Sequence, residues 1–230
     1  MKYIIILLGL LFFNNQKNKV DGAWESKQGD DVFSIIIADD YFVGVRYNVK
    51  EKKFYGTHGG TITSYDGGIK GVTEFNSVMP SEVGKPYALS IRWNGDEMNA
   101  SNNGSTIVFK RVDNGSKALA GKWRITQREQ DGNLAPIHTT GPRQTIKILS
   151  SSRFQWAAIN KENGEFFGTG GGSYSFENGK YTEMIEFFSR DSSRVGMSLT
   201  FDGKLDGKNW YHSGKSSRGE RINEVWSRQE

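Results

Sequence analysis

The segment 180–189, KYTEMIEFFS, holds the carboxylate with the greatest chemical potential in this chain. Its residues alternate between polar and apolar, and successive side chains of a strand point to opposite sides. Tyr181 and Glu183 then share a face with Ile185 and Phe187, and we assign this mostly apolar face to the interior. A buried carboxylate without a partner is costly, so Glu183 is a candidate for orienting a ligand. The alternative is a carboxylate that is hydrogen-bonded in a filled core.

Aromatic residues of the same half could form the walls of a cavity around Glu183. Trp210 and His212 share one face of the next-to-last predicted strand, and Phe201 lies on the strand before that one. Small-molecule sites are mostly apolar and carry a few fixed polar groups. The predicted ligand-binding residues are Glu183, Tyr181, Trp210, His212, Trp156, Tyr174 and Phe201. An ordinary packed core made of these residues is the alternative.

The sequence offers little for catalysis, so we predict no catalytic residue, no metal and no cofactor. The three histidines are scattered, and neither the His-Glu-x-x-His zinc pattern nor a Gly-x-Ser-x-Gly elbow occurs. The glycine run 168–173 lies within strands and has no following helix to bind a phosphate. Glu183 and Glu186 face opposite sides, which excludes a carboxylate pair acting on one sugar. A hydrolase or isomerase using Glu183 and His212 is a distant alternative.

Composition excludes several other classes. The chain has no cysteine, so disulfides, thiolate metal sites and a cysteine nucleophile are ruled out. Its net charge of +4 is spread without a basic run, so we expect no nucleic-acid partner.

The N-terminus is predicted to direct export. An apolar run from Tyr3 to Phe13 follows Lys2, and it is too short to span a bilayer as a helix. We predict a signal peptide over residues 1–15, a secreted or periplasmic location, and no stable membrane insertion once the signal is removed. An uncleaved short anchor or a buried segment is the alternative.

The chain repeats itself. Residues 54–77 and 166–189 align without a gap and are identical at nine of 24 positions, several of them glycines. The ordered correspondence continues on both sides, which indicates an internal duplication.

Each copy alternates with period two and is punctuated by Asn-Gly and Asp-Gly turns, which predicts short hairpin-connected strands. We predict an all-β protein of two consecutive antiparallel up-and-down β-barrels, because closure removes exposed strand edges. The barrels span 20–115 and 118–230. The short connection predicts that they contact each other.

Both copies begin with Gly-x-Trp and end with an arginine, and here the chain resembles the lipocalin-like (calycin) barrels. That resemblance implies that Arg111 packs over Trp24, and Arg228 over Trp123, at the closed end of each barrel. The second copy also resembles the lipocalin-like domains of uncharacterised secreted bacterial proteins. Each copy is shorter than the usual lipocalin, and the cysteines common in secreted lipocalins are missing.

Two functional hypotheses remain, besides the distant enzymatic one. The first is an exported, non-enzymatic binding protein whose second barrel holds a small apolar or aromatic molecule. The second is a cell-envelope module with filled barrels that binds a protein or a glycan. Proteins that resemble this chain often fold a long first loop over the barrel mouth, so the insertion 129–142, which contains His138, is predicted to be a lid of barrel 2; a tolerated surface insertion is the alternative. Barrel 1 offers no polar residue comparable to Glu183, so any pocket is assigned to barrel 2. His58 of barrel 1 is a weaker candidate for a ligand-binding residue.

Overall fold

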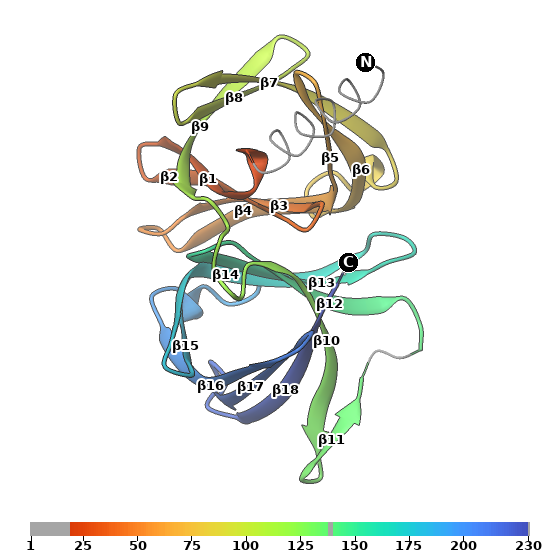
Figure 1. Ribbon diagram of the computed structural model, residues 1–230, viewed down its shortest axis with the longest axis vertical. Helices are drawn as coiled ribbons and strands as arrows, with labels where there is room; N and C mark the ends of the chain where they lie inside the picture. The colour runs from red at the N-terminus through yellow and green to blue at the C-terminus, as the bar shows by residue number, and fades with distance from the viewer. Residues whose placement is uncertain (1–18, 138–139, 230) are drawn as a thin grey trace, which may run out of the picture.

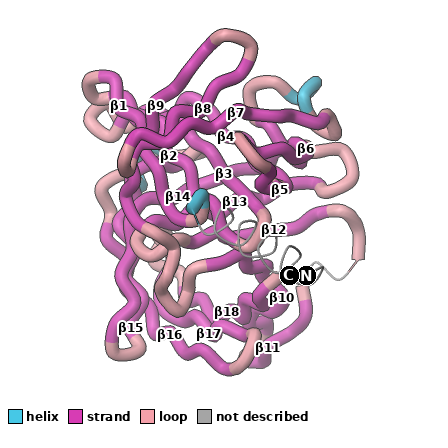
Figure 2. Tube along the Cα trace, turned by 45° about the horizontal axis from the view of Figure 1, so that its top comes forward, coloured by secondary structure: helices cyan, strands magenta, loops and turns pink. Residues whose placement is uncertain are grey.

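The computed structural model describes residues 19–137 and 140–229, and it is almost entirely β-sheet. Each half of the chain closes into an eight-stranded antiparallel barrel, and the two barrels lie side by side (Figure 1). Figure 2 shows the same tandem from a second direction, with strands dominating both halves. The prediction of two consecutive up-and-down barrels is confirmed. In the described residues, no helix is both long enough and apolar enough to cross a membrane.

Barrel 1 runs in sequence order around its circumference. Its strands are β1 (Gly22–Gln28), β2 (Asp31–Ala38), β3 (Tyr41–Asn48), β4 (Lys53–Thr61), β5 (Thr63–Tyr65), β6 (Gly68–Asn76), β7 (Pro86–Asn94), β8 (Glu97–Asn102) and β9 (Ser105–Asp113). Pairing of β1 with β9, and of β4 with β6, closes the barrel, while the short β5 forms a hairpin with β6.

Barrel 2 repeats the arrangement with one addition. Its strands are β10 (Gly121–Gln130), β11 (Asn133–Pro136), β12 (Arg143–Leu149), β13 (Arg153–Asn160), β14 (Phe166–Glu177), β15 (Lys180–Phe188), β16 (Ser198–Asp206), β17 (Asn209–Lys215) and β18 (Arg221–Arg228). β10 pairs with β18 to close the barrel. The additional strand β11 lies within the 129–142 insertion and pairs with the end of β10.

Repeated glycines mark a tight strand crossing in each barrel. A Cβ atom on Gly60 would come within 2.0 Å of the Val72 carbonyl oxygen, and one on Gly172 within 2.1 Å of the Met184 carbonyl oxygen. Both glycines sit at a β-bulge, where one extra residue of the partner strand is left unpaired. The sequence repeat therefore records a shared backbone constraint, since no larger residue fits there.

The bulge also corrects one predicted side-chain direction. The pairing of β14 with β15 shifts between Gly171 and Gly172, which makes Glu186 the extra residue. Ile185 and Phe188 line the interior of barrel 2, whereas Phe187 packs between the barrels and contacts Tyr47 with ring centroids 4.9 Å apart. Simple alternation placed Phe187 inside, and the bulge reverses the alternation at that point.

Each barrel is closed at one end by tryptophan and arginine. The guanidinium of Arg111 lies 4.0 Å from the Trp24 ring centroid, and that of Arg228 lies 4.7 Å from the Trp123 ring centroid. Each indole N–H donates to a backbone carbonyl four residues earlier, at 2.8 Å for Trp24 and 2.9 Å for Trp123. Both indoles are essentially inaccessible to solvent, so each end is a packed plug.

The barrels share an apolar wall. Residues of β2, β3 and β6 pack against residues of β12, β13 and the start of β14 in one buried cluster: Ile36, Ala38, Tyr41, Val43, Phe75, Ile146, Ile148, Ala157, Ile159 and Phe166. At its edge, Arg153 bridges Glu25 of barrel 1, at 2.7 Å, and Glu186 of barrel 2. The contact expected from the short connection is present, and strands on both sides of this wall are buried on both faces.

Candidate functional site

Barrel 2 contains a cavity of about 570 Å³ that opens at the end away from Trp123. Four of the predicted ligand-binding residues line it: Trp156, Glu183, Phe201 and His212. Further walls come from Phe154 and Trp226, so the cavity combines aromatic surfaces with ionisable groups. Such a combination is typical of small-molecule sites.

Glu183 is buried, as predicted, and it has a partner that the sequence analysis did not name. The Lys147 ammonium donates to Glu183 Oε1 at 2.9 Å, and the two side chains are only 5% and 9% exposed. Attraction in a low-dielectric interior partly offsets the desolvation of both ions. The carboxylate is therefore fixed and paired.

Lys147 is also surrounded by aromatic rings. Its Nζ atom lies 4.9 Å from the Trp226 centroid, 5.2 Å from Trp210, 5.3 Å from Tyr181 and 5.6 Å from Phe154. Ring faces attract a cation at these distances, most strongly where water is excluded. The ammonium uses one of its three donors on Glu183 and is otherwise held by rings.

His212 lies on β17, opposite Glu224 of β18, and is 3% exposed. Neither ring nitrogen makes a hydrogen bond, and Nδ1 lies 3.7 Å from Glu224 Oε2. Burial lowers the pKa of His212 and outweighs the opposing effect of Glu224, so the imidazole is neutral at physiological pH. A neutral imidazole can offer one donor and one acceptor to a molecule in the cavity.

Glu224 is the second buried carboxylate of the cavity. It accepts from Arg128 at 2.7 Å and from the Trp226 indole N–H at 3.1 Å. Burial acts to raise the pKa of Glu224, but the neighbouring His212 and the Arg128 guanidinium outweigh it and lower the pKa to about 2. The cavity therefore holds two buried carboxylates, Glu183 and Glu224, each with a cation beside it.

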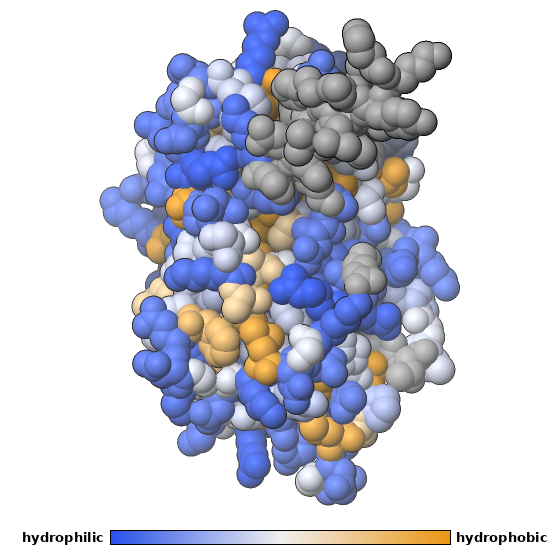
Figure 3. Space-filling model, in the orientation of Figure 1, coloured by the Kyte–Doolittle hydropathy of each residue, from blue (hydrophilic) through white to orange (hydrophobic). Residues whose placement is uncertain are grey.

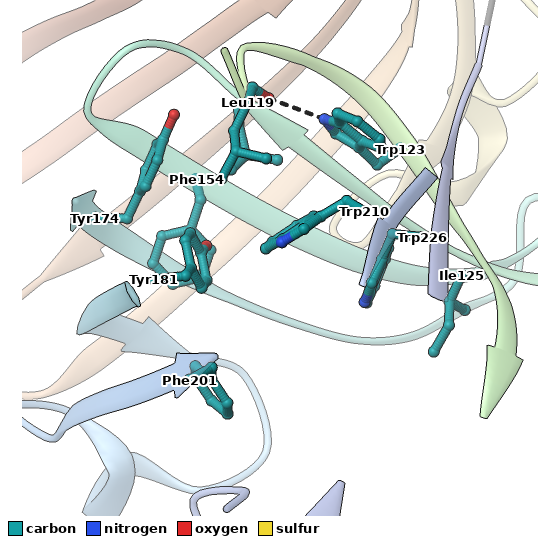
Figure 4. Packing of buried hydrophobic residues seen from close by; sticks show 10 residues of the cluster. Leu119, Trp123, Ile125, Phe154, Tyr174, Tyr181, Phe201, Trp210 and Trp226 are labelled. Carbon is teal, nitrogen blue, oxygen red and sulfur yellow. Dashed lines mark hydrogen bonds between the residues drawn. The ribbon is translucent and has the colours of Figure 1, made fainter. Parts of the chain in front are cut away.

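The remaining predicted residues lie deeper than the cavity. Tyr181 and Trp210 pack edge to face, with centroids 4.8 Å apart, and are fully buried (Figure 4). The Tyr181 hydroxyl and the Trp210 indole N–H have no hydrogen-bond partner within the described part of the chain, whereas Tyr174 donates to the Ser150 carbonyl at 2.6 Å. Burial, followed by the nearby Glu183 carboxylate, raises the pKa of Tyr181. These three residues form the floor of the site, between the cavity and the Trp123 plug.

The mouth of the cavity is formed by the β17–β18 loop, residues 216–220, together with Arg221 at the start of β18, Arg128 and Arg143. The predicted lid is not found in the described part of the insertion, because β11 extends the β10 hairpin away from the barrel (Figure 1) and does not line the cavity. His138 lies outside the described residues.

Barrel 1 has a cavity as well, which corrects the prediction that only the second half holds a pocket. Its volume is about 390 Å³, and its lining is dominated by aliphatic and aromatic side chains such as Phe33, Ile35, Leu89 and Met98. A pocket does not require an interior polar residue such as Glu183. An apolar barrel also leaves space where its residues are small, and Ala100 is one of the lining residues.

His58 is the deepest ionisable group of the barrel 1 cavity. Its ring lies between Phe33 and Phe42, with centroid distances of 6.1 and 5.4 Å, and no hydrogen bond to it is found among the described residues. Burial lowers its pKa to about 4. The barrel 1 cavity is therefore uncharged at neutral pH except near its rim, where Glu82 lies.

Sequence analysis missed Lys147 and Glu224 for different reasons. β12 carries isoleucines on the face that packs against barrel 1, so the alternation of β12 alone does not indicate that Lys147 lines the interior of barrel 2. The hairpin register that sets Glu224 opposite His212 was a usable signal, because the turn between β17 and β18 fixes it.

Among residues 19–137 and 140–229 there is no cluster of three or more side chains arranged to hold a metal ion. Most of the face seen in Figure 3 is polar, with small apolar patches between charged residues.

No protein-family model matches this chain, and no curated protein matches its sequence. Among solved structures, the uncharacterized protein YLR301w from Saccharomyces cerevisiae aligns over 91% of this chain and 98% of its own, with 10% identity and a TM-score of 0.40. A mutant of the vaccine antigen transferrin-binding protein B from Haemophilus parasuis aligns over 87% of this chain and 60% of its own, with 10% identity and a TM-score of 0.25. The Helicobacter pylori beta clamp, solved with carprofen, covers 96% of this chain and 60% of its own, at 9% identity and a TM-score of 0.19. Scores this low establish no common fold, and the barrels stand on their own hydrogen bonding.

Proposed function

We propose that this chain is an exported, lipocalin-like protein that binds a small molecule in barrel 2. The observation that carries the proposal is the buried imidazole of His212 in the wall of the barrel 2 cavity, because neither of its ring nitrogens has a hydrogen bond among the described residues. Buried polar groups in proteins are almost always hydrogen-bonded, so a buried imidazole without a hydrogen bond at the wall of a cavity favours a ligand or bound water as its partner. The tryptophan–arginine plugs support the lipocalin-like assignment.

The lining indicates the chemistry of the ligand. Trp156 and Phe188 form an edge-to-face pair with centroids 5.5 Å apart, and Phe201 lies 4.2 Å from the His212 ring. These surfaces suit a flat aromatic or conjugated body. His212 and the unused donors of Lys147 favour a polar end that accepts hydrogen bonds.

Native mass spectrometry of the protein purified from its own source tests this proposal. We expect a retained small molecule on the wild-type protein and its loss from a His212→Phe variant, which keeps the ring and removes the hydrogen bonds. Tyr211→Phe is the matched control, because Tyr211 is the neighbouring residue on the outer face. Retention by the wild type and by both variants would show that the molecule does not depend on His212.

Barrel 1 supports a second, neutral site. The described residues that line its cavity form no buried ion pair, so we propose that it accepts an uncharged apolar molecule. The fluorescent probe N-phenyl-1-naphthylamine measures this directly. Ala100→Phe should fill the cavity and abolish probe uptake by barrel 1, while His212→Phe should leave that uptake unchanged. If the wild-type protein takes up no probe in either barrel, the cell-envelope interaction module becomes the better proposal.

Export is proposed on the sequence alone, since residues 1–15 lie outside the described residues. Sequencing the N-terminus of the secreted or periplasmic protein tests it, with cleavage near Asn15–Gln16 expected. Met1 at the N-terminus of the exported protein would contradict cleavage.

A further inference from the structure

We propose that Lys147 captures its ligand covalently, by forming a protonated imine with an aromatic or conjugated aldehyde in the barrel 2 cavity. This inference rests on the proposed function of barrel 2, and it names the ligand class.

Lys147 differs from the other paired lysines in its surroundings. Five other lysines that pair with carboxylates have side chains between 57% and 80% exposed. The Lys147 side chain is 5% exposed and lines the cavity. A lysine amine in an apolar pocket is a nucleophile of the kind that forms imines with carbonyl compounds.

The site stabilises a positive charge on the Lys147 nitrogen, and imine formation keeps that charge. The ammonium and the protonated imine both carry one positive charge, so Glu183 can remain the counterion. The ring faces of Trp226, Trp210 and Tyr181, all within 5.3 Å of Nζ, attract either cation. Because the two forms carry the same charge, electrostatics does not favour the free lysine over the imine. Exclusion of water slows hydrolysis of the imine.

The groups present can carry out each proton transfer. Glu183 accepts a proton from the Lys147 ammonium, and the free amine attacks the aldehyde carbon, forming the C–N bond. A proton moves from nitrogen to oxygen, which gives a neutral carbinolamine. Glu183 then returns its proton to the hydroxyl, the C–O bond breaks, and water leaves. The sum is one ammonium and one aldehyde giving one protonated imine and one water, without any oxidation or reduction.

His212 and the aromatic walls would orient the aldehyde. His212 lines the same cavity as Lys147 and Glu183, and its ring nitrogens have no hydrogen bond among the described residues. It is therefore placed to donate to the carbonyl oxygen during attack. The conjugated part of the aldehyde would lie among Phe201, Phe188 and Trp156.

Reductive trapping tests the inference on the full-length chain. The protein is incubated with cinnamaldehyde and cyanoborohydride, and the adduct is located by peptide mapping. We expect one cinnamyl group per chain, on Lys147, formed about tenfold or more faster than on any surface lysine.

Two variants make the result specific. Lys147→Met combined with Glu183→Leu removes both charges, so no unpaired ion is left buried, and it should abolish the fast adduct. Lys180→Met is the matched control, because Lys180 also pairs with a carboxylate, Asp202 at 2.6 Å, but is 59% exposed. It should leave the fast adduct unchanged.

The outcomes separate this inference from the proposed function. Cinnamyl alcohol has the same body but cannot form an imine, and its binding is measured by quenching of tryptophan fluorescence. If the alcohol binds barrel 2 and Lys147 stays unlabelled, the covalent step is wrong and the binding function stands. If neither compound binds and the label spreads evenly over surface lysines, both are overturned.

Discussion

The two barrels have the same strand arrangement and differ in the side chains of their interiors. Barrel 2 has Lys147, Glu183, His212 and Glu224 where barrel 1 has Ile35, Gly71, Ala100 and Ile107. The correspondence follows from strand register as well as from the sequence repeat: Trp123 pairs with Lys147 as Trp24 pairs with Ile35. A duplicated backbone has therefore received a charged interior in one copy and an apolar interior in the other.

The comparison shows which parts of a barrel depend on its backbone. The glycines at the bulges and the tryptophan–arginine plugs occur in both copies, because they determine how the strands cross and close. The interior positions above the plug can change without altering the closure. The chemical character of each interior is thus set at positions that do not determine how the barrel closes.

The largest expected effect tests the charged interior. Lys147→Met alone, or Glu183→Leu alone, leaves an unpaired buried ion and should lower the free energy of unfolding by about 3–5 kcal/mol. The double variant removes both ions and should recover most of that loss. Urea denaturation of the three variants measures this, and a double variant as unstable as the singles would show that the pair is not an isolated electrostatic unit.

The next effect concerns acid stability and barrel 1. The pKa of His58 is about 4 in the folded protein and about 6.5 when unfolded, so the unfolded chain binds the proton first as the pH falls. The free energy of unfolding should therefore drop between pH 6.5 and pH 4, by at most about 3 kcal/mol from this residue. Denaturation at about pH 7 and about pH 4.5 should show a smaller drop for His58→Phe than for the wild type. An equal drop in both proteins would mean that His58 is already free to take up the proton in the folded state.

A smaller effect should be common to both barrels. Arg111→Met and Arg228→Met each remove a guanidinium from an indole face, which should cost about 0.5–2 kcal/mol. Arg228 also bridges Asp39 of barrel 1 at 3.1 Å, so its loss should loosen the shared wall as well. Hydrogen exchange at the backbone amides of Asp39 and Lys122 distinguishes the two variants, because faster exchange is expected only for Arg228→Met.

The smallest effect provides a reference for the first. Lys180→Met removes an exposed ion pair with Asp202 and should change the free energy of unfolding by no more than about 1 kcal/mol. The contrast between Lys180 and Lys147 in the same denaturation experiment isolates the contribution of burial. A loss at Lys180 as large as that at Lys147 would remove the basis for that contrast.

The sequence predicted the barrels better than their contents. Period-two alternation and hairpin turns depend on neighbouring residues, so the strands and the buried side of Glu183 could be predicted. The interior position of Lys147 could not be predicted. The apolar face of β12 packs against the other barrel, and alternation does not tell which face of a strand lines its own barrel. Phe187 was misplaced because a single bulge reverses the alternation. The barrel 1 cavity depends on side-chain volumes across several strands, which no local pattern records.

The shared wall implies that neither half of this chain is a free-standing unit. Cutting between residues 113 and 121 would leave each fragment with a flat aliphatic face opened to water, Ile36 and Val43 on one and Ile148 and Ile159 on the other. Such faces drive association, so the fragments should aggregate when produced separately and reassemble when produced together. Any regulated cleavage of the connection would therefore leave a nicked protein that still holds both of its cavities.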